Sequence, residues 1–366
     1  MKRILPIILV LILAAIVYLL VAPVPIDPVA WTPPPAPKLI GPYAQNNLLA
    51  PVQRLSLGDG RNPEDVALDS EGRIYAGFED GRIIQLQADG TQPRVFANTE
   101  GRPLGLVFDH SGNLIIADAI KGLLSVDKKG VIKVLTISAD GANFGCLNDL
   151  DVGADGTIYF TEASAKFPMS QFDNDIMEHR PNGRFLGYNP KTQQTRTLLR
   201  GIYFANGVAV SPDESYVLIA ETGLYRVIRF WLSGPKQGQS ETFIDNLPGF
   251  PDGISSNGKG KFWLSLVTPR DELLDTKLLP HPFLRKVVVR LPSFLHPAPK
   301  RYSFVLGLDE NGKVTDNLQN GAPDCYAEIA NAVERDGALY FGSIAESAVG
   351  KFKLRGDLTS TFQTMY

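Results

Sequence analysis

A short sequence phrase recurs six times between residues 64 and 343, and this repetition constrains the fold more than any other feature. Each phrase contains an alternating apolar stretch, a polar turn and a second apolar stretch. The phrases begin at Glu64, Leu104, Asn148, Asn206, Asp252 and Ile329. Intervals of 40, 44 and 46 residues match a four-stranded propeller blade, whereas intervals of 58 and 77 residues imply insertions. The sequence therefore predicts an all-β protein, a six-bladed β-propeller.

Two other architectures explain the repeat less well. A β-sandwich gives no reason for an internal phrase to recur, and an α/β protein would need helical periodicity between its strands. The stretch from Val52 to Leu57 precedes the first phrase and has the composition of a strand. We expect it to join the last blade as the outer strand, because this closes the ring and covers an open sheet edge.

The N-terminal segment predicts a membrane anchor. Lys2 and Arg3 precede an apolar run from Ile4 to Ala22, which is long enough to cross a bilayer as a transmembrane helix. A cleaved signal peptide is the alternative, but its apolar stretch is usually shorter and ends at a small-residue cleavage site. The basic residues before the run place the N-terminus in the cytoplasm and the propeller on the extracytoplasmic side.

On this interpretation the chain has three parts. Residues 1–22 form the membrane anchor, residues 23–45 a Pro-rich linker and residues 46–366 the propeller. Proline-rich segments are extended and semi-rigid, so the linker is expected to act as a spacer that holds the propeller off the membrane.

Charge, cysteine content and motifs exclude several classes of protein. The formal net charge of −3 argues against a nucleic-acid binder. The two cysteines, Cys146 and Cys325, allow at most one disulfide and lack the spacing of a zinc site. The four histidines form no HExxH motif, and the chain has no GxSxG, P-loop or GxGxxG motif.

Two insertions interrupt the repeat, at residues 163–182 and 269–301. The second contains seven basic and three acidic residues interleaved with apolar ones. Such a segment suits a lid over one end of the channel or a membrane-facing patch. An ordinary loop packed on the outside of a blade is the alternative.

The first residue of each phrase opens an inner strand, so these six residues are expected to form a ring at the mouth of the central channel. Leu104 and Ile329 would line this mouth with apolar side chains. The other four carry side-chain oxygens, namely Glu64, Asn148, Asn206 and Asp252. Two carboxylates and two amide oxygens suit a hard divalent cation, best of all Ca²⁺. The alternative is that these residues cap turns by accepting nearby backbone N–H groups, but this does not explain Glu64.

Two neighbours of Asn148 are further candidates for the pocket. Cys146 lies two residues before it and Asp149 directly follows it. The alternatives are a small buried thiol for Cys146 and a turn residue for Asp149.

Five stretches of the sequence carry a resemblance to a known family. They are PEDVALDSEGRIYAGFEDGRI, RPLGLVFDHSGNLIIADAIKGLLSVD, LNDLDVGADGTIYFTEAS, FANGVAVSPDESYVLIAET and PDGISSNGKGKFWLSL. These stretches resemble the strictosidine synthase-like branch of the gluconolactonase and paraoxonase superfamily, over about residues 45–355. The resemblance implies a Ca²⁺ site made by a Glu, two Asn and an Asp at the starts of inner strands. In this chain those positions are Glu64, Asn148, Asn206 and Asp252.

Two positions depart from the pattern of the superfamily. The plant condensing enzymes use a Glu just before the last inner strand, where this chain has Ala330, so a strictosidine synthase-type condensation is disfavoured. Sugar-acid lactonases of the superfamily have an Arg where this chain has Cys146, and sugar-lactone specificity is therefore doubtful.

The ring and the resemblance together imply a membrane-anchored, metal-dependent hydrolase of lactones or aryl esters. Its cation would polarise the substrate carbonyl, and Asp252 or a metal-bound water would act as base or nucleophile. The alternative is a non-catalytic propeller that binds a small molecule or a protein and keeps the ion for structure.

Overall fold

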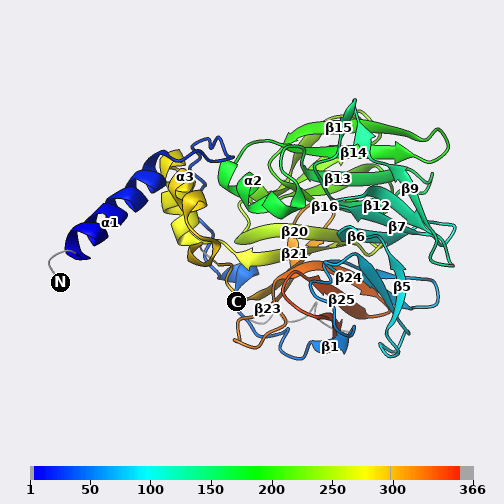
Figure 1. Ribbon diagram of the computed structural model, residues 1–366. Coiled ribbons are helices and arrows are strands. Elements are labelled where there is room, and N and C mark those ends of the chain that lie inside the picture. Colours follow the sequence, from blue (N-terminus) through cyan, green and yellow to red (C-terminus); the bar gives the residue numbers. More distant parts are fainter. Residues whose placement is uncertain (1–3, 297, 355–366) are drawn as a thin grey trace.

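The computed structural model describes residues 4–296 and 298–354 and shows a six-bladed β-propeller (Figure 1). Six four-stranded antiparallel sheets form the blades. The inner strands of successive blades contact one another, and the first also contacts the last, so the ring is closed. The propeller predicted from the repeat is confirmed.

Strands pair in chain order within blades 1 to 5, whereas in blade 6 the N-terminal β1 pairs with β26. Blades 1 to 3 comprise β2 (Val66–Leu68), β3 (Ile74–Gly77), β4 (Arg82–Leu86) and β5 (Arg94–Asn98); β6 (Pro103–Phe108), β7 (Leu114–Asp118), β8 (Gly122–Val126) and β9 (Ile132–Thr136); and β12 (Cys146–Val152), β13 (Ile158–Ser164), β14 (Gly183–Asn189) and β15 (Gln194–Ile202). Blades 4 and 5 comprise β16 (Ala205–Val210), β17 (Tyr216–Glu221), β18 (Arg226–Trp231) and β19 (Ser240–Ile244); and β20 (Gly249–Ser256), β21 (Lys261–Pro269), β22 (Ser303–Asp309) and β23 (Val314–Asn320). Blade 6 comprises β24 (Ile329–Arg335), β25 (Ala338–Ser343), β26 (Ala348–Lys353) and β1 (Gln53–Ser56).

The elements outside the blades are a two-stranded hairpin, the long N-terminal helix and several short helices. The hairpin consists of β10 (Ser138–Ala139) and β11 (Ala142–Asn143). The helices are α1 (Ile4–Val21), η1 (Gly41–Tyr43), η2 (Met169–Gln171), α2 (Phe172–Glu178), η3 (Thr222–Leu224), η4 (Leu274–Leu278), α3 (Pro282–Arg290) and η5 (Ser293–Leu295). The predicted insertions contain η2 with α2, and η4 with α3 and η5. We call the two connections at residues 165–182 and 270–302 the cap.

Neighbouring inner strands approach closely because glycines stand where they touch. A Cβ atom on Gly207 in β16 would lie 2.4 Å from the backbone nitrogen of Ile254 in β20. A Cβ atom on Gly105 in β6 would lie 2.7 Å from Cα of Asp149 in β12. Buried apolar side chains fill the spaces between successive blades farther from the axis. The glycines therefore set the narrow bore of the channel.

The strand that precedes the first phrase closes the ring, as predicted. β1 pairs antiparallel with β26, and Gln53 lies opposite Lys351. Strands from the two ends of the propeller thus share the last blade. β1 is the outer strand of this blade and pairs with the outer edge of β26.

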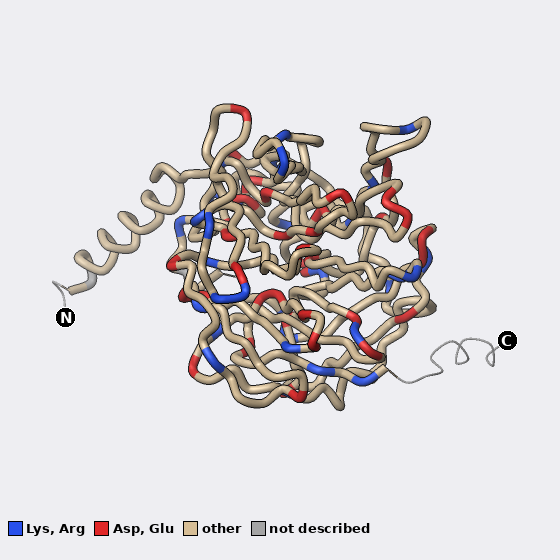
Figure 2. Tube along the Cα trace, turned by 90° about the vertical axis from the view of Figure 1, so that its right-hand side faces the viewer, with Lys and Arg blue, Asp and Glu red and all other residues tan. Residues whose placement is uncertain are grey.

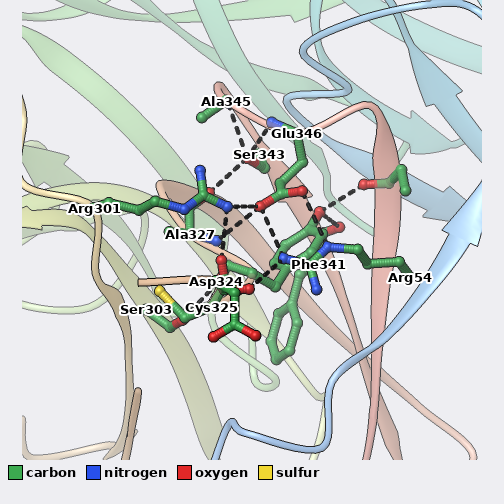
Figure 3. Close-up of polar contacts among 12 residues, drawn as sticks. Arg54, Arg301, Ser303, Asp324, Cys325, Ala327, Phe341, Ser343, Ala345 and Glu346 are labelled. Atoms are coloured by element: carbon green, nitrogen blue, oxygen red, sulfur yellow. Dashed lines mark hydrogen bonds and ion pairs between the residues drawn. The ribbon is translucent and has the colours of Figure 1, made fainter. Parts of the chain in front are cut away.

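A cluster of polar side chains around Glu346 holds this closure together (Figure 3). Arg54 of β1 donates to Glu346 from Nε at 3.2 Å and from Nη2 at 3.3 Å. Arg301, at the end of the second insertion, also donates to Glu346. The backbone N–H of Ala327 donates to the same carboxylate at 3.3 Å. One carboxylate therefore joins the N-terminal strand, the cap and the last blade.

The N-terminal helix α1 has 18 residues, none of them charged. It projects from the propeller beside α3 (Figure 1), and Figure 2 shows no charged residue along it. Most of its apolar side chains are exposed, as at Leu11 and Val21. Within the part of the chain that the structure describes, no helix is long and apolar enough to cross a membrane. The predicted transmembrane helix is therefore not confirmed.

The Pro-rich segment after α1 lies against the cap and does not stand free as a spacer. The backbone N–H of Val29 donates to the carbonyl oxygen of Glu178 at 3.1 Å, and that of Trp31 to the carbonyl oxygen of Leu279 at 3.0 Å. The Trp31 ring stacks on His179 with 4.4 Å between ring centroids. The spacer expectation is wrong here, because the N–H groups of the segment find acceptors at helix ends within the cap.

A buried arginine joins this linker to both parts of the cap. Arg285 in α3 is fully buried and donates to the carbonyl oxygens of Met177, Val29 and Leu279. Burial without a neighbouring carboxylate lowers the pKa of Arg285 to about 10. Since the three carbonyls belong to different segments, one guanidinium holds the linker and the cap in a single arrangement.

Replacing Glu346 with Gln is expected to lower the free energy of unfolding at pH 7 by about 1–2 kcal/mol, because two guanidinium groups lose a charged acceptor and both are partly solvated. Burial alone would raise the pKa of Glu346, but Arg54 and Arg301 hold it below its usual range. This stabilisation is present above the ordinary Glu pKa and is lost as the pH falls through the lower, folded-state value. Urea denaturation of both proteins at pH 7 and at about pH 3.5 measures the difference.

The matched control is Glu71→Gln, which removes one of the two acidic partners of Arg73, at a site where the Glu71 side chain is 68% exposed. This control should change the unfolding free energy by less than about 0.5 kcal/mol. Equal stability of Glu346→Gln and the parent at pH 7 would contradict the role of Glu346 in closing the ring.

Candidate metal centre

The four side chains predicted to bind a metal surround one small cavity at the mouth of the channel. Glu64 lies just before β2, and Asn148, Asn206 and Asp252 lie in β12, β16 and β20. All four residues are buried. The cavity has a volume of about 10 Å³, which is close to the space that a single water-sized sphere needs. The propeller thus brings together residues up to 188 positions apart in the sequence.

Other predicted pocket residues are only partly placed there. Leu104 and Asp149 line the cavity as expected. Ile329 and Cys146 do not line it. The remaining lining residues are Asp65, Gly105, Gly253, Ala330 and Asn331.

Ile329 faces an apolar cluster and not the channel. It is fully buried in the cluster that contains Trp263, whereas Ala330 lines the cavity. Side chains alternate along a strand, so an error of one residue in register exchanges the channel side for the opposite side. Because Ile329 and Ala330 are both apolar, the repeat alone did not show which of the two faces the channel. The structure shows that Ala330, and not Ile329, aligns with Asp252.

Cys146 is buried beside the mouth but outside the cavity. It packs with Leu104, Ala119 and Met169. Burial raises the pKa of its thiol, which disfavours the thiolate that nucleophilic chemistry needs. Cys146 and Cys325 are both free, so the one disulfide that the sequence allowed is not formed.

Asp65 and Asp149 use their carboxylates to join neighbouring blades. Asp65 accepts the backbone N–H of Leu106 at 2.7 Å, and Asp149 accepts that of Val208 at 2.9 Å. Asp65 also accepts the side-chain amide of Asn331 from the last blade. Our sequence analysis missed Asp65. It is the second residue of its phrase, as Asp149 is, and this repeated Asp could have predicted that both residues lie at the channel.

Burial raises the pKa values of the carboxyl groups at the cavity. Desolvation raises the pKa of Asp252 well above its usual value, and the nearby charge of Glu64 raises it further. Burial also raises the pKa of Glu64, while the guanidinium of Arg102 offsets part of this shift. The pKa of Asp65 is raised to about 7, again mainly by burial. Negative charge is therefore costly at this site, and a bound cation would relieve that cost.

The donor set fits a hard divalent cation. Glu64 and Asp252 offer carboxylate oxygens, and Asn148 and Asn206 offer amide oxygens, which are ligands that Ca²⁺ prefers. In the described residues, no group of three or more His, Cys, Asp or Glu side chains is placed to hold a metal. A cation at this cavity therefore depends on the two amides as well as on the two carboxylates.

The cap contacts the lining of the cavity at one residue. Met169 in η2 packs against Leu104, which lines the cavity. His179, at the end of α2, lies beside Tyr203 with 4.9 Å between ring centroids. Tyr203 lies two residues before the start of β16. A cavity of about 10 Å³ has room for an ion but not for a lactone ring.

Comparisons with known proteins agree with the resemblance carried by the repeat. The family model for strictosidine synthase matches residues 148–235, and that for the strictosidine synthase-like N-terminal region matches residues 41–86. Protein strictosidine synthase-like 6 of Arabidopsis thaliana is 33% identical over 327 residues, covering 86% of this chain and 85% of that protein. The adipocyte plasma membrane-associated protein of Bos taurus is 33% identical over 358 residues, covering 92% of this chain and 86% of that protein.

Solved structures show the same fold at lower sequence identity. A gluconolactonase from Xanthomonas campestris has a TM-score of 0.60 and 18% identity, covering 91% of this chain and 99% of that chain. A calcium-binding regucalcin from Agrobacterium tumefaciens has a TM-score of 0.57 and 14% identity, covering 83% of this chain and 96% of that chain. At these identities the likeness establishes the propeller fold alone.

Removal of divalent cations with EDTA is expected to lower the melting temperature, because an ion that binds only the native state stabilises it by linkage. At a Ca²⁺ concentration 100 times the Kd, the shift should be roughly 5 °C or more. Glu64→Ala and Asp252→Ala should abolish the Ca²⁺-dependent shift. Calorimetric scans with Ca²⁺ and with EDTA measure it.

Asp151→Asn is the control for this experiment, since Asp151 is a carboxyl group of β12 that does not line the cavity. This variant should keep the Ca²⁺-dependent shift of the parent. If the parent melts at one temperature with Ca²⁺ and with EDTA, the cavity holds no such ion.

Proposed function

This chain belongs to the strictosidine synthase-like family, and from that membership we propose that it is a metal-dependent hydrolase of lactones or aryl esters. The observation that carries the proposal is the convergence of Glu64, Asn148, Asn206 and Asp252 on one cavity. Four oxygen-bearing side chains from four blades suit a divalent cation, and Ca²⁺ is the ion we propose. The shared fold with a gluconolactonase and with a calcium-binding regucalcin is consistent with this assignment.

All four site residues would bind the cation, and one of them, Asp252, has a second role in the proposed reaction. Glu64, Asn148, Asn206 and Asp252 would hold the cation. When bound, the cation supplies Lewis acidity toward a substrate carbonyl and stabilises the developing oxyanion. Asp252 is the ligand whose carboxylate can also accept a proton as a general base. We propose that Asp252 acts as the general base that accepts a proton from the attacking water.

The cap contributes the exclusion of bulk water. Met169 of the cap packs against Leu104 at the edge of the cavity, and we propose that the cap closes the space above it. A site closed in this way strengthens electrostatic interactions with the reacting groups. Substrate binding would therefore include opening and closing of the cap.

Condensation of the strictosidine synthase type is not part of the proposal. Ala330 lines the cavity at the position where that reaction needs a carboxyl group. Glu328 is the nearest acid before it in the sequence, but it is not one of the lining residues.

A second function, a non-catalytic binding propeller with a structural ion, is favoured by one observation. The cavity of about 10 Å³ holds no more than an ion in the arrangement described above. Tight Ca²⁺ binding by a parent protein that hydrolyses no lactone or ester would support this second function.

The Asp252→Asn variant separates catalysis from ion binding. It keeps an oxygen ligand but lacks a basic carboxylate, so hydrolysis should fall by roughly 10²–10⁴-fold while most of the Ca²⁺-dependent thermal shift remains. A screen of lactones and aryl esters, with Ca²⁺ and with EDTA, gives the parent activity from which the loss is measured.

Asp151→Asn again serves as the control and should retain the parent rate. Hydrolysis that survives both Asp252→Asn and exhaustive chelation would place the chemistry at another site and overturn the proposed mechanism.

We also propose that the N-terminal segment attaches the protein to a membrane, with the N-terminus in the cytoplasm and the propeller on the extracytoplasmic side. Exposed apolar side chains along α1 and the basic residues Lys2 and Arg3 before it support this proposal. The full chain should remain in the membrane fraction after an alkaline wash, and a chain lacking residues 1–22 should not. Mature protein whose N-terminal sequence begins near Pro23 would instead indicate a cleaved signal peptide.

A further inference from the structure

A buried arginine occupies one corner of the candidate metal centre. Arg102 directly precedes β6 in blade 2 and reaches back to blade 1. Its Nη2 donates to Oε2 of Glu64 at 2.8 Å, and its Nη1 donates to the carbonyl oxygen of Asn62 at 2.9 Å. The side chains of Arg102 and Glu64 are only 8% and 11% exposed. Two hydrogen bonds to blade 1 thus fix the guanidinium beside a proposed cation ligand.

This arginine places a positive charge beside an otherwise acidic cavity. The lining includes four carboxyl groups and no Lys, Arg or His. Among the described residues, the pair of Arg102 with Glu64 is the one ion pair that any of these carboxyl groups forms. The guanidinium therefore supplies part of the charge compensation that a metal ion would otherwise supply alone.

The other carboxylates of the lining divide into two kinds. Asp65 and Asp149 accept backbone N–H groups of neighbouring blades and serve to join strands. Among the described residues, no backbone N–H group of another blade bonds to Asp252, although the Asn206 side chain of blade 4, as a hydrogen-bond partner, offsets part of the rise in its pKa that burial causes. Glu64 and Asp252 therefore remain as the charged ligands for an ion. Since Arg102 already shares Glu64, an incoming cation meets a positive charge at that ligand.

We propose that Arg102 is a built-in competitor for the metal ion, which neutralises Glu64 in the ion-free protein and lowers the affinity of the site for divalent cations. This inference rests on the cation site of the proposed function. The ion gains full use of Glu64 only at the expense of the hydrogen bond from Arg102.

The competition has opposite effects on the two states of the protein. Without an ion, loss of Arg102 leaves a buried carboxylate unpaired, which strongly destabilises a fold. With an ion, the same loss removes a repulsion between two positive charges in a site shielded from water. Replacing Arg102 by a neutral residue should therefore weaken the ion-free protein and strengthen ion binding.

The test compares Ca²⁺ affinity and thermal stability in the full-length chain. Arg102→Met removes the charge, and Arg102→Gln removes it while keeping a polar side chain in case the first variant does not fold. Isothermal titration with Ca²⁺ should show at least tenfold tighter binding by either variant than by the parent. The rise in melting temperature from EDTA to Ca²⁺ should also be larger in the variants.

Arg184→Met is a matched control. Arg184 and Glu162 form a buried pair in blade 3, with side chains 7% and 0% exposed, and neither residue lines the cavity. This variant should lose thermal stability equally with Ca²⁺ and with EDTA, and its Ca²⁺ affinity should equal that of the parent.

The outcomes separate this inference from the proposed function. Folded Arg102 variants that bind Ca²⁺ no more tightly than a Ca²⁺-binding parent would overturn the competition and leave the proposed metal site intact. Binding by the variants but not by the parent would support the inference, because Arg102 would then stand permanently in place of the ion, and would contradict a metal-dependent reaction. Absence of binding in parent and variants alike would overturn both proposals.

Discussion

The tight contact between inner strands is the constraint on which the rest of this propeller depends. Glycines such as Gly105 and Gly207 let neighbouring strands approach within ordinary backbone contact, and no larger residue fits there. Asp65 and Asp149 then bridge the strands by accepting backbone N–H groups across the contact. Because these strands converge so closely, the residues that open them share a single cavity, and the site is a direct product of how the ring closes.

That convergence has an electrostatic cost, which the molecule meets in two ways. Hydrogen bonds from backbone groups stabilise Asp65 and Asp149, and a guanidinium neutralises Glu64. Asp252 is left with a strongly raised pKa from burial and from the charge of Glu64. Buried charges without compensation usually mark a functional site and not a stabilising feature. The distribution of compensated and uncompensated carboxyl groups therefore distinguishes the structural acids from those suited to bind an ion.

The sequence was sufficient for the propeller and for the four converging side chains, because both follow from a repeat with a fixed first position. It was insufficient at Ile329, where apolar residues in successive positions fit either side of the strand. Arg102 was missed because its partner lies 38 residues earlier in another blade, and no local pattern connects the two. The docked linker was missed for a similar reason, since Trp31 finds its partners in the cap, more than 140 residues away. Contacts between distant segments follow from the closed ring and its insertions, and these become visible only in three dimensions.

The pairing of β1 with β26 sets an order for synthesis and folding. Gln53 leaves the ribosome early, while its partner Lys351 is made nearly 300 residues later. At a typical rate of about 5–20 residues per second, β1 waits roughly 15–60 s before its partner strand exists. During that time its hydrogen-bonding groups have no partner in the finished fold, and closing so long a loop is entropically slow. Completion of the ring is therefore a late event, and β1 stays exposed to wrong pairings until β26 has been made.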